Sequence, residues 1–411
     1  MNILLINHYA GSPEMGMEFR PYYFAREWVK MGHKVDIIAA DYSHLRRKNP
    51  DVKKDFQSET IDGINYHWII TNEYEGNGVQ RAITMFKFVW KLWKNAKWIN
   101  KTFNPDIVIC SSTYPLDTFA GQRIRNKSRK KIALVHELHD VWPATLIEIG
   151  NMPKYHPFIL LMQIAENSAY KNSNYIISLA QYTEEHVRKH GMKGDKFKCI
   201  PLGIDINEWN QQEKLEEYHE KIIETLKDKG NFIVGYFGGH ALSNALDILL
   251  KSAVICKQKQ KNVKFVLVGN GVEKEKLISY AKDNSLDNVI FLPPINKNEI
   301  PELLNLFDCI YIGTLKSPLY RFGLCMNKMV DAMMSGKPIL CSITSPPTWV
   351  EQCNAGIVVE SEDVEGIVDG IEKIKNLSDQ EKSQMGLRGQ NFVNKNLNIE
   401  ILSKEFLHFI S

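Results

Sequence analysis

Residues 232–271, FIVGYFGGHALSNALDILLKSAVICKQKQKNVKFVLVGNG, carry the pattern that decides the fold of this chain. An apolar run at 232–237 predicts a buried strand, a glycine pair follows it, and residues 246–257 have the pattern of a helix. A second apolar run at 264–268 ends in another glycine loop. Strand, helix and strand in this order predict a βαβ unit of a parallel sheet.

The same alternation extends along the whole chain. Strands are expected at residues 3–7, 35–39, 106–110, 132–137, 175–179 and 197–201, and again at 232–237, 264–268, 289–292, 309–312, 338–342 and 356–359. Residues 205–230 are charged, lack a strand pattern and are the expected linker. We therefore predict an α/β protein with two doubly wound, Rossmann-like parallel-sheet domains facing across a cleft. The expected boundaries are 1–203, 204–390 and a C-terminal helix, 391–411, that crosses back to the first domain.

Composition agrees with a globular protein of this size. The chain has 411 residues, of which 44% are hydrophobic and 24% charged, so a disordered chain is excluded. The net charge is +8 over residues 1–203 and −5 over 204–411, which points the first half toward an anionic surface. Seven cysteines without a C-x-x-C pair argue against a disulfide framework or a structural zinc site. Without an apolar run long enough for a membrane span or a signal-peptide pattern, a cytoplasmic location is expected.

Two loops of the first half could carry chemistry, because ligands bind beyond the carboxyl ends of parallel strands. The first contains Gly11 and Gly16 ahead of a helix expected over residues 18–31. Its glycines and the helix N-terminus favour an anion. Its spacing is not G-x-G-x-x-G, so NAD binding is weakly supported, and an ordinary strand-to-helix turn stays open as the alternative.

The second loop is the polar cluster His136-Glu137-Leu138-His139-Asp140 at a strand end. The spacing H-x-x-H could suggest a metal, but side chains three apart in a strand point to opposite faces. We interpret His139 and Asp140 as catalytic candidates. A hydrogen-bonded structural corner is the alternative.

Three glycine-containing segments of the second half predict a site for a phosphorylated ligand. Gly238, Gly239 and His240 follow one strand, and Gly269, Asn270 and Gly271 follow the next, which together indicate a bed of backbone N–H groups. In the third segment, Arg321-Phe322-Gly323 precedes a helix on which Lys328 and Asp331 lie three residues apart. A diphosphate there would be neutralised by Arg321, Lys328 and the helix dipole, and Asp331 could accept the hydroxyls of a ribose. A solvated Lys–Asp pair is the alternative. No D-x-D triplet occurs, so no metal is expected.

These motifs resemble the retaining GT-B glycosyltransferases of the family 4 type, also called glycosyl transferases group 1. The resemblance covers nearly the whole chain and includes Pro201-Leu202-Gly203-Ile204-Asp205, Leu267-Val268-Gly269-Asn270-Gly271 and Asp331-Ala332-Met333-Met334-Ser335-Gly336-Lys337-Pro338. The segments 7–13 and 319–323 further resemble a bacterial surface-polysaccharide subgroup that includes N-acetylfucosaminyl transferases.

The resemblance implies a nucleotide-sugar donor, no essential metal cofactor, and transfer with retention of anomeric configuration. It places Asp331 at the carboxylate that binds ribose, His139 near the transferred sugar and Lys328 at a phosphate. The family's first motif glutamate falls on Gly323, a departure that leaves the sugar contacts open. By the same resemblance, the donor is UDP-linked and carries an N-acetylated or deoxy amino sugar, and the acceptor is a polyprenyl-diphosphate-linked saccharide of O-antigen, capsule or other surface polysaccharide.

Two other functions remain open at this point. One is a nucleotide-sugar 2-epimerase, which uses the same two-domain fold, and the other is a non-catalytic nucleotide-binding subunit of a polysaccharide assembly complex. Nucleic acid is not an expected partner, because no recognised module accompanies the basic segments.

Residues 81–101 predict an amphipathic helix with six basic side chains and no acidic one. An apolar stripe is expected along it, formed by Ala82, Met85, Phe86, Val89, Leu92, Trp93, Ala96 and Ile99. The candidate membrane-binding residues are Arg81, Lys87, Trp90, Lys91, Trp93 and Lys94. Aromatic rings with surrounding lysines are typical of a helix lying on an anionic membrane, which predicts peripheral association with the inner face of the cytoplasmic membrane. A helix packed on its own sheet is the alternative.

Overall fold

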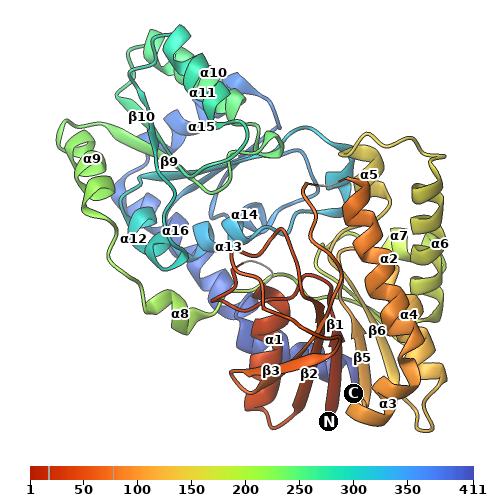
Figure 1. Ribbon diagram of the computed structural model, residues 1–411. Helices are drawn as coiled ribbons and strands as arrows, with labels where there is room; N and C mark the ends of the chain where they lie inside the picture. The colour runs from red at the N-terminus through yellow and green to blue at the C-terminus, as the bar shows by residue number, and fades with distance from the viewer. Residues whose placement is uncertain (17–18, 77) are drawn as a thin grey trace. The chain divides into compact units, whose positions relative to one another are not determined.

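The computed structural model describes residues 1–16, 19–76 and 78–411 and divides into two compact units. The first unit comprises Met1–Pro201 together with Ile399–Ser411, and the second comprises Leu202–Asn398 (Figure 1). The chain thus leaves the first unit at residue 201, two residues before the predicted boundary, and re-enters it at residue 399, eight residues after the predicted one.

The first unit is built on an eight-stranded sheet with the order β3-β4-β2-β1-β5-β6-β7-β8. Its strands, in chain order, are β1 (Asn2–Ile6), β2 (Lys34–Ala40), β3 (Gln57–Ile61), β4 (Ile64–Ile69), β5 (Ile107–Cys110), β6 (Ala133–Leu138), β7 (Tyr175–Ser178) and β8 (Phe197–Cys199). All neighbouring strands are parallel except β3 and β4. The strand order reverses at β1, so the loops after β1 and β5 adjoin at the sheet's carboxyl edge, where ligands of such sheets bind.

Helices cover both faces of this sheet. They are α1 (Phe19–Lys30), α2 (Val79–Lys94), α3 (Ala96–Phe103), α4 (Asp117–Asn126), α5 (Ala144–Glu148), α6 (Pro157–Asn172), α7 (Glu184–Lys189) and α17 (Ile399–Ile410). Helices α1 and α17 pack together over one face, where the indole of Trp28 donates to the Ser403 carbonyl at 3.1 Å. Helices α2, α3 and α4 pack over the other face. Burial of alternating strand residues on both faces explains why the strands are almost wholly apolar.

The second unit contains a six-stranded, all-parallel sheet with the order β11-β10-β9-β12-β13-β14. Its strands are β9 (Phe232–Phe237), β10 (Val263–Val268), β11 (Val289–Leu292), β12 (Cys309–Gly313), β13 (Ile339–Ser342) and β14 (Gly356–Val359). Its helices are α8 (Ile206–Asn210), α9 (Glu217–Asp228), α10 (Leu246–Gln258), α11 (Lys274–Asp283), α12 (Ile300–Asn305), α13 (Asn327–Met334), α14 (Trp349–Gln352), α15 (Val364–Asn376) and α16 (Asp379–Asn396), with short 3₁₀ turns η1 (Leu242–Asn244), η2 (Lys297–Glu299) and η3 (Pro318–Phe322). The order reverses at β9, so the glycine loop after β9 lies at the position where a ligand is expected.

Three features differ from the sequence-based predictions. The antiparallel hairpin of β3 and β4 was not predicted, although Asp62-Gly63 joins the two strands with φ of 50° and 79°, the positive values that a tight hairpin turn requires. The single helix predicted over 81–101 is two helices, α2 and α3, that meet at Asn95. The C-terminal helix predicted over 391–411 is also wrong as one element, because α16 ends at Asn396 in the second unit and α17 begins at Ile399 in the first.

Candidate active site

A buried charge network lies at the carboxyl edge of the first unit's sheet. Glu137 is at the end of β6, Ser111 directly follows β5, and Arg20 comes from the first turn of α1. The Arg20 guanidinium donates to Glu137 Oε1 from Nε at 3.0 Å and from Nη2 at 2.9 Å. The Ser111 hydroxyl donates to Glu137 Oε2 at 2.6 Å. His139 Nε2 lies 2.9 Å from Ser111 Oγ and 3.1 Å from Glu137 Oε2, so the carboxylate orients this imidazole.

This network keeps Glu137 ionised. Burial opposes the charge of its carboxylate, but the Arg20 charge and the hydrogen bonds from His139 and Ser111 outweigh burial and hold the pKa of Glu137 well below its usual range. Arg20 also donates to the carbonyls of Ile200 and Pro201. A fully paired buried charge of this kind fixes the geometry around it, because leaving any member without its partner is costly.

His139 and Asp140 have different surroundings. The His139 side chain is 9% exposed and lines a narrow pocket with Ser112, Tyr114, Trp142 and Tyr170 among others. Asp140 lines the same pocket and is exposed. The ring of His136 lies 5.7 Å from the Tyr170 ring, and burial lowers the pKa of His136 to about 4. His136 and His139 have different near neighbours, but both line this pocket, because His139 lies beyond the last residue of β6 and strand alternation no longer applies to it.

The glycine loop after β1 is held by its own unit. The Gly11 carbonyl accepts a hydrogen bond from the Tyr66 hydroxyl at 2.8 Å. Gly16 has φ of +75°, and a Cβ there would lie 3.1 Å from the Cγ of Arg47. The glycine at this position is thus explained by backbone conformation and close packing. The predicted helix start at residue 18 lies outside the described residues.

In the second unit, the two predicted glycine loops pack directly against each other. A Cβ on Gly269 would lie 2.0 Å from the Gly238 carbonyl oxygen, and one on Gly271 would lie 2.4 Å from that of His240. The amides of Gly238 and His240 donate to the carbonyls of Val268 and Asn270 at 3.0 and 2.8 Å. The expectation of a bed of free N–H groups is therefore wrong for these two amides, because they join the loops together. Gly239 lies exposed between them.

Lys328 is the predicted residue that the structure brings to these loops. Its ammonium donates to the Tyr236 hydroxyl at 2.9 Å and to Asn244 Oδ1 at 2.8 Å. Its Cε would lie 3.6 Å from a Cβ on Gly238. Burial lowers the pKa of Lys328 to about 8, since no carboxylate compensates its charge. An ammonium held by neutral groups at the end of β9 is suited to an anionic ligand.

His240 lies buried beside this lysine. Its ring is 5.8 Å from that of Tyr236, and burial together with the charges of Lys274 and Lys328 lowers the pKa of His240 to about 4. The imidazole is therefore neutral at physiological pH. Neither ring nitrogen has a hydrogen-bond partner among the described residues.

Asp331 and Arg321 do not join Lys328. Asp331 lines a separate pocket with Asp205, Glu208 and Lys297, and burial raises the pKa of its carboxyl to about 7, opposed by the Lys297 charge. Arg321 is exposed, donates to the Pro318 carbonyl at 2.6 Å and stacks 4.2 Å above the ring of Phe322. Phe322 itself is buried, and Gly323 ends η3 with φ of +84°. Helical spacing placed Lys328 and Asp331 on one face, but their side chains reach different neighbours.

The predicted membrane-binding residues of α2 divide into two groups. Three of its cations bind within the unit: Arg81 to the Tyr9 hydroxyl, Lys87 to the Thr71 carbonyl and Lys91 to Asp55. Trp90, Trp93 and Lys94 are exposed. The buried face is Thr84, Met85, Phe88 and Leu92, whereas Phe86 and Trp93, predicted in the same stripe as Met85, belong to a second, exposed face. No helix in the described ranges is long and apolar enough to cross a membrane.

Four residues of these two polar clusters were not predicted. They are Arg20 and Ser111 around Glu137, and Tyr236 and Asn244 around Lys328. Ser111 and Tyr236 could have been found, because one directly follows a strand and the other lies two residues before the Gly238-Gly239 pair on the same side of β9. Arg20 and Asn244 reach their partners across the fold, so local sequence carried no signal for them.

Comparison with known proteins identifies the class. Residues 15–208 match the family model described as Glycosyltransferase Family 4, and residues 217–391 match the one described as Glycosyl transferases group 1. The chain belongs to this family of glycosyltransferases, and its two parallel-sheet units are those of the GT-B fold.

Individual relatives are distant. The chain is 24% identical over 221 residues to the capsular polysaccharide biosynthesis glycosyltransferase CapM of Staphylococcus aureus, covering 53% of this chain and 51% of CapM. It is 23% identical over 282 residues to an uncharacterized glycosyltransferase of Methanocaldococcus jannaschii, covering 66% of this chain and 63% of the relative. The chain therefore matches only about half to two thirds of the length of these relatives.

Similar solved structures cover the whole fold. Sucrose-phosphate synthase from Thermosynechococcus elongatus superposes with a TM-score of 0.72 at 15% identity, covering 99% of this chain and 98% of that one. Anabaena HepE, solved in complex with UDP and glucose, has a TM-score of 0.67 at 17% identity, with coverage of 99% and 98%.

We predict that Glu137→Gln lowers the free energy of unfolding of the first unit by about 3–5 kcal/mol, because it leaves the buried Arg20 charge without its counter-ion. Urea unfolding followed by tryptophan fluorescence measures this. Glu184→Gln is the matched control, since its pair with Arg188 is about half exposed and should change stability by only about 0–1 kcal/mol. Equal effects of the two substitutions would show that the network does not stabilise the unit.

Proposed function

We propose that this protein is a retaining glycosyltransferase that moves a sugar from a UDP-linked donor to a lipid-linked saccharide acceptor in surface-polysaccharide synthesis. The observation that carries the proposal is Lys328, a part-buried ammonium beside the Gly238-Gly239 loop at the point where the second sheet's order reverses. The UDP in the HepE structure and the capsular function in the name of CapM support the choice of donor and pathway class.

Sugar transfer from a nucleotide-sugar donor requires stabilisation of the leaving diphosphate and of the positive charge that develops on the sugar. In this proposal Lys328 pairs with the diphosphate, Asp331 accepts the ribose hydroxyls, and Arg321 adds an exposed cation. Protein cations then do the work that a divalent metal does in other transferases, so no metal cofactor is proposed for transfer. The proposed donor sugar is an N-acetylated or deoxy amino sugar.

His139 is proposed to contact the transferred sugar from the first unit. Its Nε2 is held by Glu137 and Ser111, and Glu137 is held by Arg20, so the imidazole is fixed before a substrate binds. A preorganised group of this kind gains catalytic effect because it needs no rearrangement during the reaction.

A screen of UDP-, GDP- and dTDP-sugars by thermal shift tests the donor, because a bound donor stabilises the folded state. Purified protein is then incubated with the stabilising donor and a lipid-linked saccharide. Transfer with retained configuration supports the proposal. Interconversion of the free nucleotide sugar would identify an epimerase, and binding without transfer or hydrolysis would identify a non-catalytic subunit.

We predict that UDP affinity falls about tenfold between pH 7 and pH 9, since the ammonium of Lys328 loses its proton above its pKa of about 8 and with it the attraction for phosphate. Lys328→Arg should abolish this dependence, because a guanidinium stays protonated over the range. Isothermal titration calorimetry measures both. The exposed Lys251 provides the control, and Lys251→Arg should keep the wild-type profile. An unchanged affinity in the wild-type protein would remove Lys328 from the diphosphate site.

We predict that His139→Ala lowers kcat by about 10²-fold or more while UDP affinity stays within about twofold, because the imidazole is proposed to meet the sugar and not the nucleotide. Steady-state kinetics at saturating donor and calorimetry with UDP give the two values. A normal kcat would reduce His139 to a structural residue.

We also propose that the exposed face of α2 lies on an anionic membrane. Its apolar side chains Val79, Ile83, Phe86, Trp90 and Trp93 recur at alternating intervals of four and three residues and are all at least 41% exposed. The Lys94 ammonium lies 5.0 Å from the Trp90 ring, and the Arg123 guanidinium lies 3.4 Å from that of Trp93. Leu160 and Ile164 of α6 are exposed as well, and Phe158 at the start of α6 contacts Phe86 at 6.2 Å between ring centroids. Exposed apolar and aromatic side chains with cations beside the rings are typical of a helix that lies at the depth of the lipid headgroups.

We predict that the protein floats with anionic liposomes at low salt and is released at high salt. Lys94, Lys97 and Lys127 are exposed, so replacing all three with Glu should abolish flotation, each lysine contributing about 1 kcal/mol. The same change at Lys221, Lys251 and Lys276 of the second unit, also exposed, is the control and should leave flotation intact. Equal recovery on neutral and anionic vesicles would contradict the proposal.

A further inference from the structure

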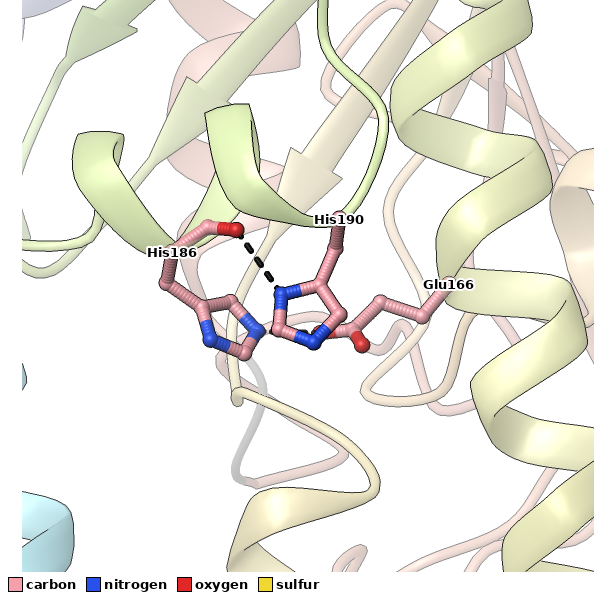
Figure 2. A group of neighbouring side chains, drawn as sticks. All are labelled: Glu166, His186 and His190. Atoms are coloured by element: carbon pink, nitrogen blue, oxygen red, sulfur yellow. Dashed lines mark hydrogen bonds and ion pairs between the residues drawn. The ribbon is translucent and has the colours of Figure 1, made fainter.

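A histidine pair and a buried carboxylate meet where α6 and α7 pack in the first unit (Figure 2). His186 lies in α7, His190 directly follows that helix, and Glu166 lies in α6. Glu166 is only 1% exposed, whereas both histidines are partly exposed. In the part of the chain that the structure describes, these residues form the one group of three metal-ligating side chains that approach closely enough to share an ion.

The distances between their ligand atoms are short. His186 Nε2 lies 2.7 Å from Glu166 Oε1, and one ligand atom from each of the three residues lies within 4.8 Å of the others. Neighbouring ligands of a tetrahedral zinc are about 3.3 Å apart, given metal–ligand bonds of about 2.0–2.1 Å. To surround one ion, these atoms must move closer by rotation of the two imidazoles, and the ion must displace the proton that His186 Nε2 donates to Glu166 Oε1.

His190 already has the tautomer that a metal requires. Its Nδ1 lies 2.9 Å from the carbonyl oxygen of His186, one helical turn earlier, and Figure 2 shows this bond. Since a carbonyl only accepts, Nδ1 carries the proton, and in the neutral imidazole Nε2 then keeps its lone pair. Metal-bound histidines commonly donate their other N–H to a backbone carbonyl in this way. The Nε2 atom makes no hydrogen bond to any residue in the described ranges.

Glu166 is held in place from its own helix. The Tyr170 hydroxyl donates to Oε1 at 2.9 Å, and the Gln163 side-chain amide donates to Oε2 at 2.6 Å. These bonds leave the carboxylate at a fixed position and orientation. Such outer hydrogen bonds to a ligating carboxylate are the usual support of a metal site.

We propose that Glu166, His186 and His190 bind one divalent transition metal of the zinc class, with water as a fourth ligand. Two imidazoles and one carboxylate match the ligand preference of zinc, whereas magnesium and calcium take oxygen ligands. The ion links α6 to α7. Because Glu166 and Tyr170 also line the pocket that contains His139, the ion holds one wall of that pocket and takes no part in the transfer chemistry.

The test is metal binding by the full-length, tag-free protein. After treatment with a chelator, zinc is titrated in competition with a chromophoric chelator, and cobalt is added to a second sample to record its visible absorption. We expect one zinc per chain and a cobalt spectrum of tetrahedral intensity. His190→Gln should weaken zinc binding at least about tenfold. This variant keeps the fold, because the only hydrogen bond that the His190 side chain makes in the described structure is to its own helix.

A control variant and a second ligand variant make the result decisive. His408→Gln removes an exposed histidine from α17 and should leave zinc affinity unchanged. Glu166→Gln should lose the site as His190→Gln does, provided that its circular dichroism spectrum is native. Absence of stoichiometric zinc binding, or equal affinity in wild-type protein and His190→Gln, would overturn the proposal and leave the cluster as a hydrogen-bonded link between two helices.

Discussion

The ion pair of Arg20 and Glu137 is the interaction on which the first unit's functional edge depends. Two charges are buried there, and each is used completely: the guanidinium binds the carboxylate and the carbonyls of Ile200 and Pro201, and the carboxylate also accepts from Ser111. The pair thereby joins α1 to the carboxyl ends of β5, β6 and β8. Hydrophobic packing could have filled the same space with equal stability. A network of charged and hydrogen-bonded groups instead fixes the orientation of its members, and here it fixes the imidazole of His139.

In the second unit, the loops at the carboxyl edge of the sheet are held in place by close contact between their backbones. Gly269 and Gly271 leave no room for side chains, so the loops after β9 and β10 bond directly to each other. The two loops therefore pack as one surface, and the side chain of Lys328 extends from α13 to lie beside Gly238. Its neighbours Tyr236 and Asn244 are neutral hydrogen-bonding groups, so its charge is solvated without being cancelled. An anion entering this place meets a cation whose electrostatic attraction is still available.

Most of the fold could be predicted from sequence, because parallel strands covered on both faces are nearly continuous apolar runs. All twelve predicted strands correspond to strands of the structure, and β9, β11 and β14 have the predicted bounds. Strand β3 was missed because residues 57–61 are mostly exposed and polar, and β4, although buried, was missed because Asn65 and His67 interrupt its apolar run. The Asp62-Gly63 turn between the two strands was a sufficient clue.

The candidate site could be predicted only where a residue's role follows from its place along the chain. His139 and Lys328 were chosen as candidates in this way, since each lies near a strand end or a helix start. Helical spacing misjudged the relation of Lys328 to Asp331, because spacing gives the side of a helix and not the end point of a long side chain. The i,i+4 spacing of His186 and His190 was also visible, but their carboxylate partner Glu166 comes from another helix. Residues that act together across helices become recognisable only when packing, which no local pattern encodes, has brought them into contact.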